Sequence, residues 1–236
     1  MNIHILKSKK EASLYASAKI IHQIHHKPNS VLGLSTGNTM ISIYNDLVHA
    51  YKNHMTAFVK VKTFNVDEYA DISRYNKNSF FYFMNKYLFS KTDIKLKNTN
   101  FPIETNSKSY DKIIKETGGL DLLILGIGRN GHIAFNEPGK SSNLSSKTRK
   151  IILSDETIKV NKLHRKNITH AYTVGISTIL KAKKIVIVAF GKEKSNAVYN
   201  LVNGKMGYNN PSAFLRDHNN FMLILDQDAA RLLSIR

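Results

Sequence analysis

The stretch GIGRNGHIAFNEPG, residues 126–139, places a histidine and a glutamate in one short loop bounded by glycines. An imidazole whose second nitrogen is held by a carboxylate is an effective proton carrier near neutral pH, because its unperturbed pKa is about 6.5. A histidine that merely makes a hydrogen bond within its loop is the simpler alternative. His132 and Glu137 are therefore candidates for proton-transfer chemistry.

The same stretch matches G-x-G-x-x-G, the glycine pattern of dinucleotide-binding loops, after the apolar run LDLLIL. That pattern needs its third glycine to lead into a helix and an acidic residue about 20 positions later. Here Pro138 and Gly139 end any helix within a turn or two, and no acidic residue occurs between Glu137 and Asp155. We therefore expect no nicotinamide or flavin at this loop.

Two adjacent carboxylates, Asp67 and Glu68, follow the apolar segment VKTFNV. Successive side chains at a strand's end point to opposite sides, so we expect one carboxylate to face a site and the other solvent or a partner. A solvated acidic loop is the simpler alternative. Because the chain is strongly basic, we expect cationic neighbours to keep a carboxylate here ionised and available as a base.

A candidate phosphate seat follows the apolar segment VLGLS. Thr36, Gly37, Asn38 and Thr39 stand where a strand turns into a helix. Backbone N–H groups at a helix start, with hydroxyl groups beside them, bind phosphate well. The segment is too short for a Walker loop, so ATP is not implied, and an ordinary helix cap is the simpler alternative.

Other chemistries find little support in the sequence. The chain has no cysteine and no G-x-S-x-G segment, so a nucleophilic thiol or serine elbow is not expected. His22, His25 and His26 fall on one amphipathic helix without a matching pattern of carboxylates. Proton transfer on an anionic substrate remains, and we expect neither a metal nor another cofactor.

The elements that must position these residues alternate regularly along the chain. Apolar segments rich in Val, Ile, Leu and Phe recur at residues 3–6, 31–35, 61–66, 120–127, 184–190 and 221–226. Helical spacing follows at residues 10–26, 39–53, 78–89, 107–117, 154–164, 193–203 and 227–235. This alternation predicts a doubly wound α/β fold, with a mostly parallel sheet flanked by helices on both faces, as in Rossmann-like proteins. Ligands bind beyond the carboxyl ends of such strands, where the loops described above belong.

Length and charge narrow the class of protein. With 236 residues and 42% hydrophobic content, we expect one domain over residues 1–236. No run of 18 apolar residues and no signal-peptide pattern occurs, so we expect no membrane association and a cytoplasmic location. The net charge of +18 favours anionic partners, but the basic residues are scattered, with no RRM-like motif or zinc-finger spacing. We therefore expect a small phosphorylated metabolite rather than nucleic acid.

Five segments together resemble one enzyme family. LGLSTGNT, TFNVDEY, LDLLILGIGRNGHIAFNEPG, AYTVGISTIL and AFGKEKSNAV occur in the order and spacing of glucosamine-6-phosphate deaminases, over about residues 2–230. GHIAFNEPG is the most specific piece, since the related 6-phosphogluconolactonases have a loop like GHTASLFP there. The resemblance implies isomerisation and hydrolytic deamination of D-glucosamine 6-phosphate to D-fructose 6-phosphate and ammonia, a step of amino-sugar catabolism.

The resemblance also implies roles for individual residues. Asp67 would be the base that moves a proton between C2 and C1, while His132 would move the proton during ring opening, with Glu137 and Asn130 beside it. The phosphate would bind to Thr36, Gly37, Asn38 and Thr39, together with Lys194 in GKEK, without a metal. The protein could be a homo-oligomer.

Three positions depart from the family pattern. Asn130 stands where many members have Asp, and Asn38 changes the more usual turns T-G-G-T and T-G-S-T. A phosphate-binding arginine usually ends a helix that resembles ANSRFF, and Leu163 stands at that place here. Arg165 lies two residues further, a step that turns a helix by about 200°. Loss of a bidentate arginine contact bears directly on substrate identity.

These departures leave two alternatives. The chain could be an isomerase or lactonase for another sugar phosphate, or a catalytically weak regulator that binds a sugar phosphate. Asp67, His132 and Glu137 argue against the regulator, because a sensor needs no groups that move protons.

Overall fold

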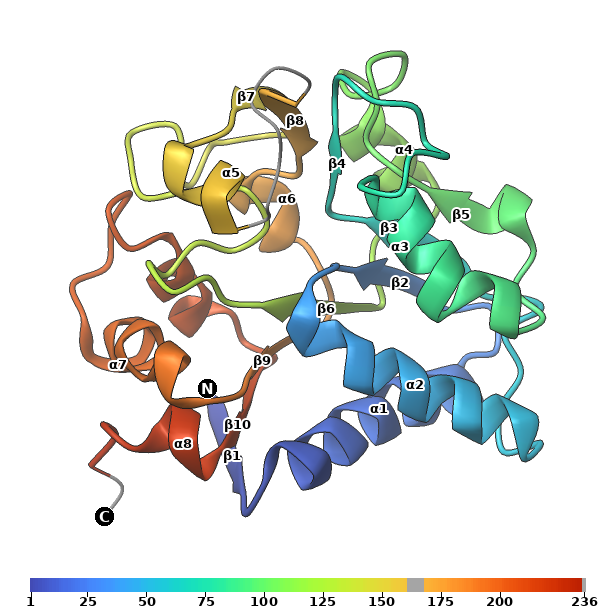
Figure 1. The fold of residues 1–236 in the computed structure, drawn as a ribbon, viewed down its shortest axis with the longest axis horizontal. Coiled ribbons are helices and arrows are strands. Elements are labelled where there is room, and N and C mark those ends of the chain that lie inside the picture. Colours follow the sequence, from blue (N-terminus) through green and yellow to red (C-terminus); the bar gives the residue numbers. More distant parts are fainter. Residues whose placement is uncertain (161–167, 235–236) are drawn as a thin grey trace.

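A seven-stranded parallel sheet forms the centre of the computed structural model, which describes residues 1–160 and 168–234 (Figure 1). The strand order is β1-β10-β9-β6-β2-β3-β5, and all six neighbouring pairs are parallel. The strands are β1 (Asn2–Leu6), β2 (Val31–Leu34), β3 (Lys62–Asn65), β5 (Thr99–Asn100), β6 (Leu122–Gly126), β9 (Ile185–Ala189) and β10 (Phe221–Asp226). Each of the six predicted apolar segments forms one of these strands.

Helices cover both faces of this sheet. In β6, Leu122 and Ile124 pack into the core that α1, α2 and α3 cover, whereas Leu123 and Leu125 pack into the core on the opposite face. The first face carries α1 (Lys9–His26), α2 (Asn38–Lys52) and α3 (Phe80–Tyr87). The second carries α4 (Tyr110–Glu116), α6 (Ile176–Ile179), α7 (Ser195–Asn203) and α8 (Gln227–Ala230). Burial on both faces explains the unbroken apolar runs and confirms the predicted doubly wound fold.

A smaller antiparallel sheet was not predicted. It consists of β4 (Asp67–Tyr69), β8 (His170–Thr173) and β7 (Arg149–Ile152), and α5 (Asp155–Val160) follows β7 (Figure 1). The three strands are short, and β7 is only partly buried, so none produces a long apolar segment. Because β4 comes directly after β3, this sheet begins beyond the carboxyl ends of the main strands.

The order of the strands creates a crevice at one place. From β2 the chain continues to β3 on one side, whereas β6 pairs with β2 on the other side. Such a switch in direction separates the loops that follow the two strands, and ligands of open α/β sheets bind there. Among the described residues, no helix is both long and apolar enough to cross a membrane.

Candidate active site

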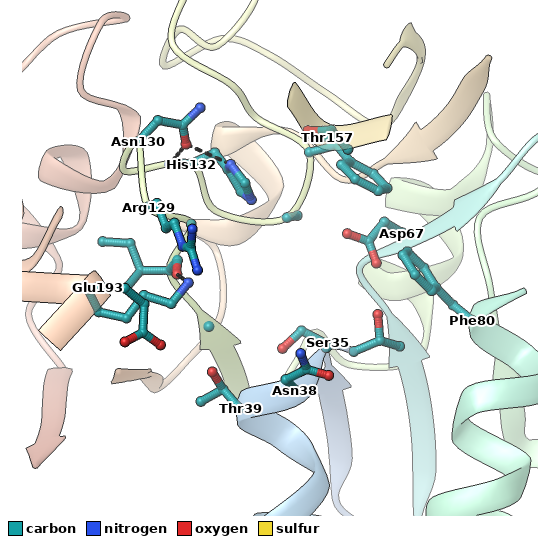
Figure 2. Close-up of a pocket in the computed structure, with 18 residues that line it drawn as sticks. Ser35, Asn38, Thr39, Asp67, Phe80, Arg129, Asn130, His132, Thr157 and Glu193 are labelled. Atoms are coloured by element: carbon teal, nitrogen blue, oxygen red, sulfur yellow. Dashed lines mark hydrogen bonds between the residues drawn. The ribbon is translucent and has the colours of Figure 1, made fainter. Parts of the chain in front are cut away.

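A pocket of ≈ 300 Å³ lies at this crevice (Figure 2). It is lined by the loops after β2, β6 and β9 and by residues of β4, α2, α3 and α5. The predicted site residues that line it are Thr36, Gly37, Asn38, Thr39, Asp67, Asn130, His132 and Lys194. Glu137 does not line the pocket itself, but it contacts His132. The fold thus brings together residues that are up to 158 positions apart, from Thr36 to Lys194.

A network of hydrogen bonds orients the His132 imidazole. The Asn130 amide nitrogen donates to Glu137 Oε2 at 2.6 Å, which leaves the Asn130 oxygen 2.7 Å from His132 Nδ1. Glu137 Oε1 lies 3.3 Å from the same nitrogen and also accepts a hydrogen bond from Thr157 at 2.7 Å. Because both neighbours of Nδ1 are acceptors, this nitrogen carries the proton, and Nε2 is left to exchange a proton with a ligand.

The charge of Glu137 is stable in this network. Burial alone would raise the pKa of Glu137, but the hydrogen bond and charge of His132 outweigh it, with help from Thr157 and Asn130. The pKa of Glu137 falls to about 2 as a result. The imidazole of His132 therefore has a negatively charged neighbour at neutral pH.

Gly128 is required by the position of His132. A Cβ atom at residue 128 would lie 2.3 Å from His132 Nδ1 and Cε1, because the imidazole packs directly on the glycine backbone. Gly131 has φ of 86°, which glycine adopts without strain, and its N–H donates to the Gly128 carbonyl. Gly128 and Gly131 thus make room for His132, and they do not lead into a helix as the glycines of a dinucleotide-binding loop do.

Substitution of Gly128 by alanine is expected to displace the His132 ring and lower kcat by about 100-fold, since an error of about 1 Å has this effect in active sites. The substitution leaves Asn130 and Glu137 unchanged, so we expect the protein to remain folded. Steady-state rates and the melting temperature measure the two effects. Gly207→Ala is the matched control, since a Cβ there meets nothing within 4 Å, its φ is not positive, and it does not line the pocket. An unchanged kcat for Gly128→Ala would contradict the close packing.

Asp67 is buried at the inner end of the pocket. It is 6% exposed, and its Oδ1 has no hydrogen-bond partner among the described residues. Burial, followed by the charge of Glu68, raises the pKa of Asp67 well above its usual value. The expectation that cationic neighbours would hold the carboxylate in its ionised form is therefore wrong in direction, because loss of water dominates over the charge of the chain. A carboxylate with a raised pKa is a stronger base once ionised.

Glu68 faces neither the pocket nor solvent. It is 3% exposed, and its carboxylate accepts hydrogen bonds from the backbone N–H groups of Tyr69, Phe80 and Phe81 at 2.8–2.9 Å. Two of these N–H groups belong to the first turn of α3, whose positive end favours a carboxylate. The expectation that one carboxylate of the pair faces a site holds for Asp67. Glu68 does not face solvent as expected, and it has a structural role.

The other end of the pocket is positively charged. The helix α2 begins there after Gly37, whose φ of 104° suits glycine, and no side chain caps this helix. Its first N–H groups are therefore available to an anion. Lys194 is half-buried and its amino group donates to the Ile127 carbonyl oxygen at 2.8 Å. Burial, above all, lowers the pKa of Lys194; the Glu193 charge opposes this shift and the Arg129 charge adds to it.

Sequence reasoning missed several residues of the pocket. Thr157 supports Glu137 from α5, and only the fold reveals that contact. The rings of Phe80 and Phe135 stack with centroids 5.8 Å apart and line the pocket with Asp67. Arg129 and Glu193 also line it, and both lie inside the segments that carry the family resemblance, which was the available signal.

Some expectations concern other parts of the chain. Leu163 and Arg165 lie outside the described residues. In the described ranges, no group of three or more His, Asp and Glu side chains is placed to hold a metal ion.

Comparisons with known proteins agree with this geometry. The family model described as glucosamine-6-phosphate isomerases/6-phosphogluconolactonase matches residues 8–224. A glucosamine-6-phosphate deaminase of Clostridium novyi (strain NT) is 42% identical over 99% of this chain and 100% of its own length. One from Mycoplasma mycoides subsp. mycoides SC is 40% identical over 99% and 98% of the two chains.

Two solved structures are similar to this chain over almost its whole length. A monomeric glucosamine-6-phosphate deaminase superposes with a TM-score of 0.94 at 32% identity, over 99% of this chain and 100% of that one. The 6-phosphogluconolactonase of Trypanosoma brucei shares the fold at 18% identity, with a TM-score of 0.78 over 99% and 98% of the chains. By the match of its sequence over most of its length, this chain belongs to the family of glucosamine-6-phosphate isomerases and 6-phosphogluconolactonases.

Proposed function

We propose that the protein is a glucosamine-6-phosphate deaminase, which converts D-glucosamine 6-phosphate and water to D-fructose 6-phosphate and ammonia. The observation that carries this proposal is the arrangement of one pocket. A buried carboxylate, Asp67, and an oriented imidazole, His132, share it with the N-terminus of α2 and Lys194. The full-length relatives named for this activity support the same reaction.

The phosphate group is held at the positively charged end. Thr36, Gly37, Asn38 and Thr39 offer backbone N–H and polar side-chain groups, and Lys194 adds a positive charge. Anchoring the phosphate there extends the hexose toward Asp67, so that C1 and C2 reach the carboxylate. His132 Nε2 then accepts the proton of the C1 hydroxyl and returns a proton to the ring oxygen as the bond between C1 and that oxygen breaks.

The open-chain sugar is next isomerised by Asp67. The carboxylate removes the proton from C2, and the electrons form a double bond between C1 and C2 as the C1 oxygen takes up a proton. Return of a proton to C1 leaves a ketimine at C2. Water adds to C2, and ammonia departs to give the ketose. Each proton transfer by a positioned group contributes on the order of 10²–10⁴ in rate.

The rate is expected to fall on acidification at a higher pH than an ordinary aspartate would give. Only the ionised carboxylate is a base, and burial raises the pKa of Asp67 above 3.8, so activity is lost as pH falls through that raised pKa. Glu137, with a pKa of about 2, stays ionised over this range. The pH profile of kcat/KM and that of C2 hydrogen exchange should share this acidic limb. A limb at or below pH 3.8 would contradict the raised pKa.

The activity itself is tested by incubating the protein with glucosamine 6-phosphate and measuring ammonia and fructose 6-phosphate in equal amounts. Unphosphorylated glucosamine controls for the phosphate, and 6-phosphogluconolactone controls for lactonase activity. Hydrolysis of the lactone without release of ammonia from glucosamine 6-phosphate would contradict this proposal and would indicate a lactonase. Stabilisation by glucosamine 6-phosphate with no ammonia over hours would instead favour a regulator.

The proposed substrate carries charged phosphate and ammonium groups and does not cross a lipid bilayer unaided, and we propose the cytoplasm as its compartment. We also propose that one chain suffices for activity. The support for this proposal is a solved relative that is described as monomeric.

A further inference from the structure

We propose that Arg129 is a second cationic ligand of the substrate phosphate and grips it together with Lys194. The identity of the substrate rests on the function proposed above. The inference that the bound group is an anion rests on the residues of the pocket. Arg129 follows β6 and Lys194 follows β9, and these two strands are paired neighbours in the sheet. Both side chains line the same pocket.

The two positive charges are close to each other. Lys194 donates its hydrogen bond to the carbonyl of Ile127, two residues before Arg129. After burial, the charge of Arg129 is a further cause of the lowered pKa of Lys194. Two cations that face one small space repel each other, and this arrangement becomes favourable when an anion binds between them.

The described residues supply no carboxylate that neutralises Arg129. Among the side chains that the structure describes, which exclude those of Glu156 and residues 161–167, no carboxylate lies within 4.0 Å of the Arg129 guanidinium group, and Lys194 has no such ion pair either. Glu193 lines the pocket, but its carboxylate folds back on its own loop. A Cβ added to Gly191 would lie 2.6 Å from Glu193 Oε2, so this oxygen packs on the Gly191 backbone. The guanidinium group therefore remains available to a ligand.

The position of Arg129 suits a phosphate rather than the reacting carbons. Figure 2 shows its side chain extending into the pocket on the side of Glu193 and Thr39, across from Asp67. A hexose 6-phosphate has its phosphate at the opposite end from C1 and C2, which matches this separation. The planar guanidinium donates two parallel hydrogen bonds to phosphate oxygens, whereas the lysine acts as a point charge.

The matched control is Lys192, an exposed residue of the same loop as Lys194 that does not line the pocket. Arg129→Gln and Lys192→Gln each remove one positive charge from this side of the molecule. If Arg129 served only the general basic field of the chain, both variants would weaken binding equally, and salt would remove the difference from wild type.

The test measures KM and kcat for glucosamine 6-phosphate and the inhibition constant of orthophosphate. Arg129→Gln is expected to raise KM and the inhibition constant by about 10- to 100-fold, as loss of a charge-assisted hydrogen bond predicts, with kcat within about threefold. Arg129→Lys should recover part of the loss, and Lys192→Gln should stay within about twofold. Unchanged constants in Arg129→Gln, or equal changes in Lys192→Gln, would overturn the proposal.

The two proposals fail in distinguishable ways. If the wild-type protein released no ammonia from glucosamine 6-phosphate, the proposed function would be wrong. Calorimetric titration of the same variants with orthophosphate would still decide the role of Arg129. If wild-type deamination proceeded while Arg129→Gln bound orthophosphate as tightly as wild type, only the present inference would be wrong.

Discussion

Replacement of Asp67 by asparagine is expected to abolish exchange of the C2 hydrogen of glucosamine 6-phosphate with deuterated solvent, while binding of the sugar phosphate remains largely intact. Asparagine keeps the shape of the side chain but cannot accept the proton. Deamination should fall by about 10²–10⁴, because the variant lacks the proposed base of that step. Proton NMR of the substrate in deuterated water follows the exchange, and calorimetry follows binding.

The stability of this variant separates loss of chemistry from loss of fold. The pKa of Asp67 is raised in the folded protein, so its contribution to stability is greatest at low pH and is lost as pH rises through the raised pKa. At pH 7, which is above the ordinary pKa of an aspartate, burial of this carboxyl group therefore costs stability, and asparagine removes that cost. The melting temperature at pH 7 should not fall below that of wild type.

A matched control is Asp217→Asn, which makes the same change at an exposed residue outside the pocket. It should leave the exchange rate of C2 and the rate of deamination unchanged. If Asp67→Asn retained C2 exchange at the wild-type rate, another residue would be the base. If Asp67→Asn lost exchange because it no longer bound the sugar phosphate, Asp67 would have a role in binding instead.

Replacement of His132 by glutamine is expected to slow opening of the pyranose ring more than it slows turnover of an open-chain substrate analogue. Glutamine retains hydrogen-bonding groups near Asn130 and Glu137, but it has no group that takes up and releases a proton near neutral pH. We expect kcat with the cyclic substrate to fall by about 10²–10⁴. Parallel rate measurements on the two substrates give the ratio.

His22→Gln, at an exposed position of α1, controls for a general effect of the substitution and should leave both rates unchanged. Equal losses on the cyclic and open-chain substrates would contradict a role in ring opening. In that case the network of Asn130, Glu137 and Thr157 would serve to shape the pocket.

The main sheet could be predicted because its strands are buried on both faces. Such strands become unbroken apolar segments, and all six expected segments form strands of the observed sheet. The predicted helix at 227–235 is shorter in the structure, since α8 ends at Ala230. The antiparallel sheet was missed because its strands are short and mix polar with apolar residues (DEY, RKII and HAYT), so none of them forms an apolar segment.

The local environment of the acids could not be predicted. Asp67 and Glu68 are adjacent and chemically alike, yet Asp67 faces the pocket with an unpaired oxygen and Glu68 binds the start of α3. The pKa of Asp67 depends on how much water reaches it, which is a property of the packed structure. Net charge over the whole chain was a poor guide to that one position.

By itself, the sequence determined the fold class, the loops that form the pocket and the proximity of His132 to Glu137, because apolar periodicity and short loops act over a few residues. Only the tertiary structure decided that Arg129 and Thr157 share one pocket with Asp67, His132 and Lys194, which the family resemblance had named. Their positions depend on the order of the strands in the sheet, because β3 lies on one side of β2 and β6 lies on the other. Those features arise from contacts between residues far apart in the chain, which no local pattern encodes.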